Sequence, residues 1–273
     1  MTSSNQTLAF IGGGNMASAI IGGLLRQGHR AEHILVVEPH DEARERLLSS
    51  NGIRAMESAC DDLNQAGLVI WAIKPQIFKE VATQTRPFCG QALHLSVAAG
   101  IQTDSMAMWL GSDKLVRAMP NTPALVGLGQ TGLYARAGVG AEDKRWVEQV
   151  IATTGQFLWV EQESLLDAVT AISGSGPAYV FFFIEAMIEA GVGMGLTPEQ
   201  AHQLAVGTFV GASQLARSAT ESPAVLRERV TSKGGTTYAA ITAMQEAQLS
   251  ALFARALEAA RARAKELGEE FGR

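Results

Sequence analysis

The stretch Leu8-Ala9-Phe10-Ile11-Gly12-Gly13-Gly14-Asn15-Met16-Ala17 decides the fold of this chain. Leu8 to Ile11 form a continuous apolar run, which is typical of a parallel strand covered on both faces, and a segment with helical spacing follows at about 15–28. Gly12, Gly14 and Ala17 between them make the pattern G-x-G-x-x-A. Its first glycine permits a tight turn, its second lets the backbone approach a pyrophosphate, and the small third residue lets helix pack on strand. The stretch therefore predicts a dinucleotide-binding turn rather than an ordinary glycine-rich turn.

The same alternation continues through the first half of the chain. Further apolar runs predict strands, and the amphipathic segments between them predict helices. The strands are expected at 8–11, 34–38, 68–73 and 93–97, with extensions of the sheet at 115–118, 132–135 and 156–160. The helices are expected at 15–28, 41–50, 75–84 and 102–110. This order predicts a doubly wound Rossmann sheet with helices on both faces.

The second part of the chain has a different pattern. Strand signals stop at about residue 163, and segments rich in Ala, Glu, Gln and Leu continue with helical spacing. Thr197-Pro198 and Ser222-Pro223 each pair a cap residue with a proline, so helices are expected to begin at about 198 and 223. We therefore expect an α/β dinucleotide-binding Rossmann domain at 1–162 and an all-α domain at 163–273.

The composition excludes several classes of protein. The 273 residues are 47% hydrophobic and 18% charged, which argues against disorder. The net charge of −5 argues against a nucleic-acid or anionic-membrane partner. Cys60 and Cys89 have no metal-binding spacing and are too few for a secreted disulfide scaffold. The first residues lack the pattern of a signal peptide, and the longest aliphatic-aromatic run, Tyr179 to Ile184, is too short to cross a bilayer. We expect a cytoplasmic protein that binds no metal.

Residues at the strand ends are candidates for cofactor contacts. Glu38 ends the second expected strand, where an acidic residue commonly accepts hydrogen bonds from the adenosine ribose, and this favours NADH. His40, Arg44 and Arg46 follow closely enough to offset the charge and admit NADPH, and a solvated strand-end charge is the simpler alternative. Ligands of doubly wound sheets lie outside the carboxyl ends of the strands, although such segments can also be plain turns. The expected cofactor contacts are Gly12, Gly13, Gly14, Asn15, Met16, Ala17, Glu38, Ala72, Lys74, Pro75, Ser96, Ala98, Ala99 and Gly100.

Three other segments are candidates for a substrate pocket. Met119-Pro120-Asn121-Thr122-Pro123 is a loop stiffened by two prolines, which suits a pocket wall or a structural connection equally well. Glycines cluster at 173–177 and 232–237 within the helical part, where glycine inside a helix is unfavourable. Backbone N–H groups and threonine hydroxyls at the start of a helix after 232–237 would suit a carboxylate, with an ordinary helix cap as the alternative.

These segments, in this order, resemble the pyrroline-5-carboxylate reductase family over almost the whole chain. The most specific part lies between Pro223 and Ile241 and contains Val230-Thr231-Ser232-Lys233-Gly234-Gly235-Thr236-Thr237. The blocks at 10–17, 72–76, 96–100, 119–123 and 173–178 match the family as well.

The resemblance implies reduction of (S)-1-pyrroline-5-carboxylate to L-proline, the last step of proline biosynthesis, by hydride transfer from NADPH or NADH. It also implies a homodimer with interlocked helical domains, in which each site joins the cofactor domain of one subunit to the Gly-Gly-Thr-Thr segment of its partner, and further assembly of dimers into a ring. Family members mostly use NADPH, so Glu38 leaves the cofactor preference open, and we expect measurable activity with NADH.

The resemblance also implies roles for individual residues. The resemblance points to the hydroxyl of Thr237 as the catalytic group, a hydrogen-bond partner or proton relay to the ring nitrogen. No His, Asp or Glu within the matched substrate blocks is an obvious general acid. The expected substrate contacts are Met119, Pro120, Asn121, Thr122, Ser175, Gly176, Ser232, Gly235, Thr236 and Thr237. Two alternatives remain open at this point: a β-hydroxyacid dehydrogenase, whose catalytic lysine block is not visible, and a non-enzymatic dinucleotide-binding regulator.

Overall fold

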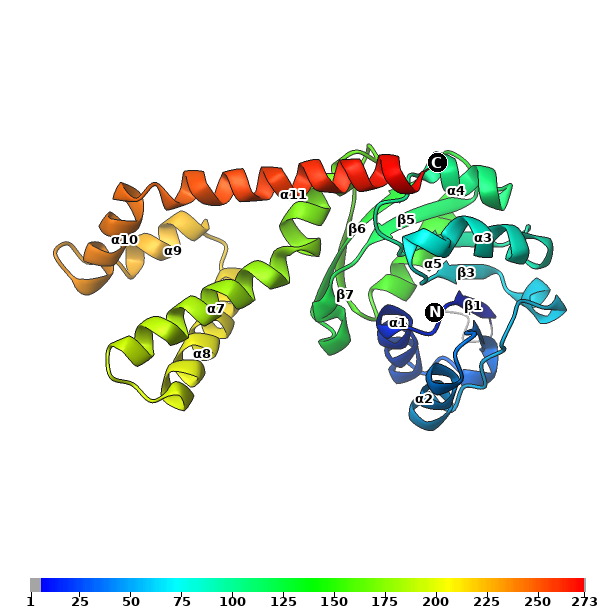
Figure 1. The fold of residues 1–273 in the computed structure, drawn as a ribbon, viewed down its shortest axis with the longest axis horizontal. Helices are drawn as coiled ribbons and strands as arrows, with labels where there is room; N and C mark the ends of the chain where they lie inside the picture. Colours follow the sequence, from blue (N-terminus) through cyan, green and yellow to red (C-terminus); the bar gives the residue numbers. More distant parts are fainter. Residues whose placement is uncertain (1–5, 273) are drawn as a thin grey trace. The chain divides into compact units, whose positions relative to one another are not determined.

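The computed structural model describes residues 6–272, so the N-terminal segment that carries no sign of a signal peptide lies largely outside the described residues. Within them seven strands form one sheet in the order β2-β1-β3-β4-β5-β6-β7 (Figure 1). The strands are β1 Leu8–Ile11, β2 Ile34–Val37, β3 Leu68–Trp71, β4 Leu93–Ser96, β5 Leu115–Met119, β6 Gly129–Ala135 and β7 Gly155–Trp159. All neighbours pair in parallel except β5 and β6, which are antiparallel. The expected Rossmann sheet is confirmed, with one reversed pair.

Helices cover both faces of this sheet because alternate residues of each buried strand point to opposite sides. Phe10 of β1 packs in one core with Ile20 and Val150, whereas Ile11 packs in a second core with Phe78 and Trp109. The helices concerned are α1 Asn15–Arg26, α2 Asp41–Asn51 and α5 Ala141–Ile151 on the first side, and α3 Pro75–Thr85 and α4 Thr103–Leu110 on the second.

Helix α5 is an element that the strand and helix pattern did not reveal. It joins β6 to β7, which run parallel, and a parallel pair needs a crossover connection that is usually helical. Its buried residues Val147, Val150 and Ile151 face the sheet. The remaining short segments of this part are the 3₁₀ turns η1 Ala31–His33, η2 Asp61–Gln65, η3 Arg86–Phe88 and η4 Thr122–Val126, helix α6 Leu165–Val169, and the π-helical turn η5 Thr170–Gly174.

The rest of the chain is helical, as expected. The helices are α7 Gly176–Gly193, α8 Pro198–Ser218, α9 Pro223–Arg229, α10 Thr236–Glu246 and α11 Leu249–Phe271. Helix α8 begins at the expected residue with a capping box, because the Gln200 backbone N–H donates to Thr197 Oγ1 and the Thr197 N–H donates to Gln200 Oε1. Helix α9 also begins as expected, with Ser222 Oγ accepting from the Val225 N–H.

The chain divides into two compact units. One runs to Ser175 and includes Ala260 onward, and the other is Gly176–Ala259. These limits differ from the domain limits expected from the sequence because α6 and the end of α11 pack within the first unit. Val169 and Leu166 lie against Gly132 of β6, and Leu267 and Phe271 lie against Gly100.

The unit Gly176–Ala259 buries very little. Its buried residues are Gly191, Ala201 and Ala205, while many large apolar side chains, including Phe182 and Leu215, are exposed. The stretch Leu165–Gly193 is also long and apolar enough to cross a membrane by length and composition, a weak criterion that core helices of soluble proteins satisfy as well. Large exposed apolar surfaces mark interaction sites on soluble proteins, so these helices offer a candidate surface for a partner.

The sheet contains a fully buried histidine, His94 of β4. Its Nδ1 accepts a hydrogen bond from Trp71 Nε1 at 3.2 Å, and its Nε2 has no partner among residues 6–272. Burial lowers the pKa of His94 to about 4. The folded protein therefore holds this imidazole neutral in a pH range where the unfolded chain would bind a proton.

We predict that the protein loses stability as the pH falls from about 6.5 toward 4. In this window the unfolded state binds the proton that folded His94 excludes, so the free energy of unfolding should drop by about 2 kcal/mol between pH 7 and pH 5 through this residue. Urea unfolding at both pH values and one protein concentration measures the loss. His94→Gln should remove most of it, and the matched variant His202→Gln, at an exposed site on α8, should not. An unchanged pH slope in His94→Gln would contradict the assignment.

Candidate dinucleotide and substrate site

The turn between β1 and α1 has the geometry of a phosphate-binding turn. Gly12 has a φ of +98°, and a Cβ built on it would lie 2.5 Å from the carbonyl oxygen of Ala72, so this position accepts only glycine. Gly14 is exposed, and an added Cβ there would meet nothing within 4 Å, which leaves room for a ligand. Ala17 is fully buried where α1 packs on the sheet. The tight turn at Gly12 and the helix packing at Ala17 are as the sequence pattern predicts, whereas the approach of a pyrophosphate to Gly14 stays a prediction.

The N-terminus of α1 is open toward an anion. The Ser18 N–H donates to Gly14 O at 2.9 Å, so the N–H groups of Asn15, Met16 and Ala17 precede the first bond of the helix. Gly14 supplies no side-chain cap, and the first turn contains no acidic residue. Free N–H groups and the helix dipole favour a negative charge at this end. The turn and helix thus fit the diphosphate of a dinucleotide.

Glu38 lies directly after β2, beside this turn. Its Oε2 accepts the Gly13 backbone N–H at 2.8 Å, its Oε1 accepts the His40 N–H at 3.0 Å, and only 6% of the residue is exposed. A Cβ on Gly13 would lie 2.7 Å from Leu47 Cδ1 and 3.3 Å from Glu38 Oε2, which explains the middle glycine of the turn. The structure therefore joins two of the expected cofactor residues by a hydrogen bond.

The other strand-end residues have more varied surroundings. Ala72 donates its N–H to Ile11 O at 2.8 Å and faces Gly12 through its carbonyl, whereas Lys74 is exposed and precedes Pro75, the first residue of α3. Ser96 is fully buried, and its Oγ accepts the N–H of Ala98.

Residues Ala99 and Gly100 follow with opposite environments. Ala99 is exposed, but Gly100 is buried with a φ of +77°, and a Cβ on it would lie 3.3 Å from both Leu267 Cβ and Phe271 Cδ2 of α11. Gly100 thus has a packing reason for being glycine that the sequence did not reveal, since α11 lies more than a hundred residues further along the chain.

Two of the expected substrate blocks lie side by side in the first unit. Asn121 is buried and connects two segments, because its Nδ2 donates to Ser173 O at 3.0 Å and its Oδ1 accepts the Gln130 N–H at 2.8 Å. The methyl carbon of Met119 would lie 2.5 Å from a Cβ on Gly174. The π-helical turn ends with the Ser175 N–H donating to Thr170 O at 2.8 Å, and such turns are frequent at functional sites. Pro120 is buried and Thr122 is exposed.

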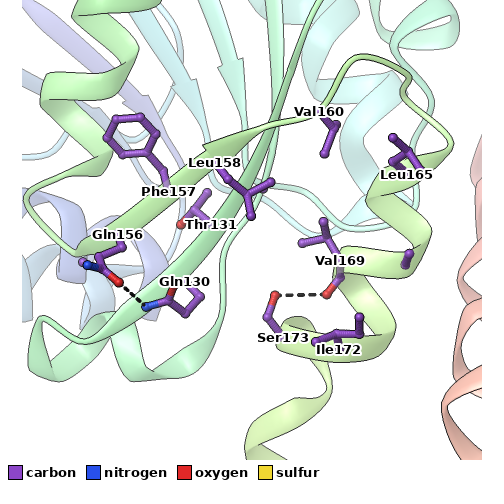
Figure 2. Close-up of a pocket in the computed structure, with 13 residues that line it drawn as sticks. Gln130, Thr131, Gln156, Phe157, Leu158, Val160, Leu165, Val169, Ile172 and Ser173 are labelled. Atoms are coloured by element: carbon purple, nitrogen blue, oxygen red, sulfur yellow. Dashed lines mark hydrogen bonds between the residues drawn. The ribbon is translucent and has the colours of Figure 1, made fainter. Parts of the chain in front are cut away.

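An open groove adjoins these blocks in the same unit (Figure 2). It has a volume of about 840 Å³ and lies between strands β6 and β7 and the segment α6–η5. Leu158, Val169 and Ile172 give it an apolar lining, while Ser173 binds Val169 O through its hydroxyl at 3.0 Å. The sequence patterns gave no sign of the groove, because the segments that line it, from β6 to η5, are brought together only by the fold.

A partly buried ion pair supports the strand that leads to Met119. The Arg117 Nη1 donates to Glu163 Oε1 at 2.8 Å, and Glu163 also accepts from the backbone N–H and the hydroxyl of Thr103 at the start of α4. Arg117 is almost fully buried, and a buried charge requires such partners. The pair therefore links β5, α4 and the segment before α6, which local sequence patterns cannot indicate.

The Gly-Gly-Thr-Thr segment belongs to the unit Gly176–Ala259. Gly234 has a φ of +73°, and the Gly235 N–H donates to Ser232 O at 3.0 Å, which forms a tight turn before α10. The first bond of α10 runs from the Ala239 N–H to Gly235 O, and its first turn has neither a side-chain cap from Gly235 nor an acidic residue. Thr236 is exposed and Thr237 half-buried. This helix start has the free N–H groups and nearby hydroxyls that a carboxylate needs.

Among residues 6–272, no three His, Cys, Asp or Glu side chains gather at a spacing that would hold a metal ion. The groups present at these segments are backbone N–H groups, which can bind an anion, and hydroxyls, which can form hydrogen bonds.

Comparisons with known proteins agree with this geometry. A family model described as pyrroline-5-carboxylate reductase dimerisation matches residues 163–267, and one described as NADP oxidoreductase, coenzyme F420-dependent, matches residues 7–100. The pyrroline-5-carboxylate reductase of Pseudomonas aeruginosa is 43% identical over 98% of this chain and 99% of its own length. That of Pisum sativum is 34% identical and covers 97% of both chains.

Solved structures show the same similarity. The pyrroline-5-carboxylate reductase of Coxiella burnetii superposes with a TM-score of 0.91 at 37% identity, covering 96% of this chain and 98% of that one. The Plasmodium falciparum enzyme, solved with NADP bound, has a TM-score of 0.85 at 28% identity and covers 97% and 99% of the two chains.

This agreement extends over both parts of the chain, including the blocks on which the resemblance was based. It makes the chain an oxidoreductase with a Rossmann-type site for NAD(P)H, and it removes the ground for the hydroxyacid dehydrogenase and regulator alternatives. The chain belongs to the pyrroline-5-carboxylate reductase family.

Proposed function

We propose that this protein reduces (S)-1-pyrroline-5-carboxylate to L-proline with NADPH or NADH. The observation that carries the proposal is the open N-terminus of α10 behind Gly234 and Gly235, which suits the substrate carboxylate, in a member of this family. The open N-terminus of α1 would hold the cofactor diphosphate. On this basis the residue range 1–162 serves the cofactor, and 163–273 serves dimerisation and substrate binding.

In this proposal, separate residues bind the cofactor, bind the substrate carboxylate and protonate the ring nitrogen. A bound nicotinamide would supply the hydride that adds to the imine carbon. Gly14 and the first N–H groups of α1 hold the diphosphate, and Ser232, Gly235 and Thr236 hold the carboxylate. The Thr237 hydroxyl would donate a hydrogen bond to the ring nitrogen and relay to it a proton taken from solvent, so that the nitrogen is protonated as its carbon accepts the hydride. Positioning the two reactants can supply several kcal/mol of rate acceleration without an ionisable acid.

The first unit contributes the remaining contacts in this proposal. Lys74, Pro75, Ala98 and Ala99 lie at strand ends beside the cofactor turn, with Ala72 touching it directly. The block held together by Asn121, which binds Ser173 O and the Gln130 N–H, forms the wall of the substrate pocket. Met119, Pro120, Thr122 and Ser175 complete that wall, and Gly176, the first residue of the other unit, is a further substrate contact in this proposal.

A second copy of the chain covers the apolar helices in this proposal. The unit Gly176–Ala259 has almost no core of its own, and the matched dimerisation model spans it. Interlocked helical units would bury Phe182, Leu215 and similar side chains, and assembly of dimers into a ring is part of the same proposal. A protein partner rather than lipid is favoured because Glu185 and Glu189 lie on α7, inside the stretch apolar enough for a membrane. A cytoplasmic location and the absence of nucleic-acid partners follow from this function and from the acidic net charge.

The function is tested by following NAD(P)H absorbance with three substrates in parallel. With pyrroline-5-carboxylate we expect oxidation of NAD(P)H and formation of proline. With a small β-hydroxyacid and NAD(P)+ we expect no comparable rate of NAD(P)H formation. Turnover of the hydroxyacid alone would identify a hydroxyacid dehydrogenase, and cofactor binding without turnover of either compound would identify a regulator. A six-membered cyclic imine in the same assay defines the ring size that the pocket accepts.

We predict that Thr237→Ala lowers kcat with pyrroline-5-carboxylate at least tenfold, which corresponds to about 1.4 kcal/mol of activation free energy. The variant loses the hydroxyl that binds the ring nitrogen, so cofactor affinity should stay unchanged. Thr237→Ser keeps the hydroxyl and should retain most of the activity. Wild-type turnover in Thr237→Ala would remove this residue from the mechanism.

We predict that the wild-type protein is a dimer or a multiple of a dimer in light scattering at micromolar concentration. Leu215→Asp places a charge on an exposed apolar site of α8 and should shift the distribution toward monomer, because a buried unpaired charge is costly. Thr83→Asp, on the exposed side of α3, serves as the control and should leave the mass unchanged. A monomeric wild type, or binding of the protein to neutral phosphatidylcholine vesicles, would contradict a dimer that covers these helices.

A further inference from the structure

The carboxylate of Glu38 is held in one orientation by two backbone donors. Gly13, inside the cofactor turn, donates its N–H to Oε2, and His40 donates its N–H to Oε1. Each carboxylate oxygen has about two acceptor sites, so each keeps about one for a further donor. Since only 6% of Glu38 is exposed, the group also lies in surroundings where charge is weakly screened. It is thus a fixed pair of acceptors beside the turn.

The nearest cation is already engaged. Arg44 Nη1 donates to Glu38 O at 2.9 Å and to Pro39 O at 2.7 Å, and its Nη2 pairs with the carboxylate of Asp41. The first turn of α2 adds a second carboxylate, that of Glu42. Arg44 is therefore committed to two carbonyls and another acid, whereas His40 and Arg46 are exposed. The segment 38–46 has four carboxylates against two arginines, so this edge of the site keeps a net negative charge.

We propose that Glu38 makes NADH, rather than NADPH, the preferred cofactor of this protein, an inference that rests on the proposed function. The ribose hydroxyls of NADH are donors and match the free acceptor sites of Glu38. The 2′-phosphate of NADPH carries about −1.5 to −2 charges and offers mainly acceptors, so it meets Glu38 with repulsion and no hydrogen bonds. The preference separates this chain from the family model described as NADP oxidoreductase and from the relative solved with NADP bound.

The test measures binding of NADH and NADPH by isothermal titration calorimetry without substrate. The wild type should bind NADH at least about tenfold more tightly, and the ratio should narrow at higher salt because the repulsion is screened. Glu38→Gln keeps an oxygen that can accept the Gly13 N–H but removes the charge, so it should reduce the ratio about tenfold, as expected for close charges in weakly screened surroundings. Glu45→Gln, which removes an exposed carboxylate from the neighbouring helix α2, is the matched control and should leave the ratio unchanged.

A second variant tests whether the ion pair with Asp41 keeps Arg44 from binding NADPH. Adding Asp41→Asn to Glu38→Gln releases the guanidinium from its ion pair, and the double variant should bind NADPH more tightly than Glu38→Gln alone. Circular dichroism and thermal unfolding identify any variant that has lost its fold. In that case the ratio of NADH to NADPH affinity in the wild type, with its salt dependence, decides whether NADH is preferred.

The outcomes separate this inference from the proposed function. Equal or tighter binding of NADPH by the wild type, or an unchanged ratio in a folded Glu38→Gln, would overturn the cofactor preference. Tighter NADH binding that depends on Glu38 supports the preference even if pyrroline-5-carboxylate is not turned over, and the absence of turnover would count against the proposed function alone. Steady-state kcat/KM values with both cofactors should follow the binding ratio.

Discussion

The close approach between the turn at Gly12 and the end of β3 is the constraint on which the rest of the site depends. Gly12 donates its N–H to Val37 O at 2.8 Å and leaves no space for a Cβ beside the carbonyl of Ala72. One backbone position therefore joins the ends of β1, β2 and β3 and directs the chain into α1. Any side chain at this position would separate the strands or displace the helix, and both the diphosphate site and the position of Glu38 would be lost.

Buried polar side chains in this protein serve backbone groups first. Glu38 accepts two N–H groups, Asn121 connects Ser173 O to the Gln130 N–H, and Glu163 binds Thr103 as well as Arg117. A buried polar atom without a partner is costly, so each of these groups is held in a single orientation. In the proposed cofactor preference, the same fixed orientation would let Glu38 discriminate between ligands, because its remaining acceptor sites cannot turn away from a charge.

The two units bury their apolar residues in different ways. The sheet unit encloses two cores of its own, one on each face, whereas the helices between Gly176 and Ala259 bury little beyond Gly191, Ala201 and Ala205. Those helices form because their caps and spacing favour them locally, as at Thr197 and Ser222. Their exposed apolar side chains gain free energy only when a second surface covers them.

The sequence by itself determined most of the strands and helices and the types of residue at the candidate site. Apolar runs predicted β1 at its observed limits and the other strands to within a few residues, and cap-proline pairs predicted where α8 and α9 begin, because these signals act over a few neighbouring residues. The positions of Gly12, Gly14 and Ala17 in the turn between β1 and α1 could be predicted for the same reason. Only the tertiary structure decided that β6 runs antiparallel to β5, that α5 connects β6 to β7, that Gly100 packs against α11, and that Arg44 is engaged by Asp41 and two carbonyls. Most of these features join residues that are distant in the sequence, and even Arg44 depends on how β2 meets α2 in space. Local periodicity contains no information about such contacts, because they arise from the packing and hydrogen bonding of the whole fold.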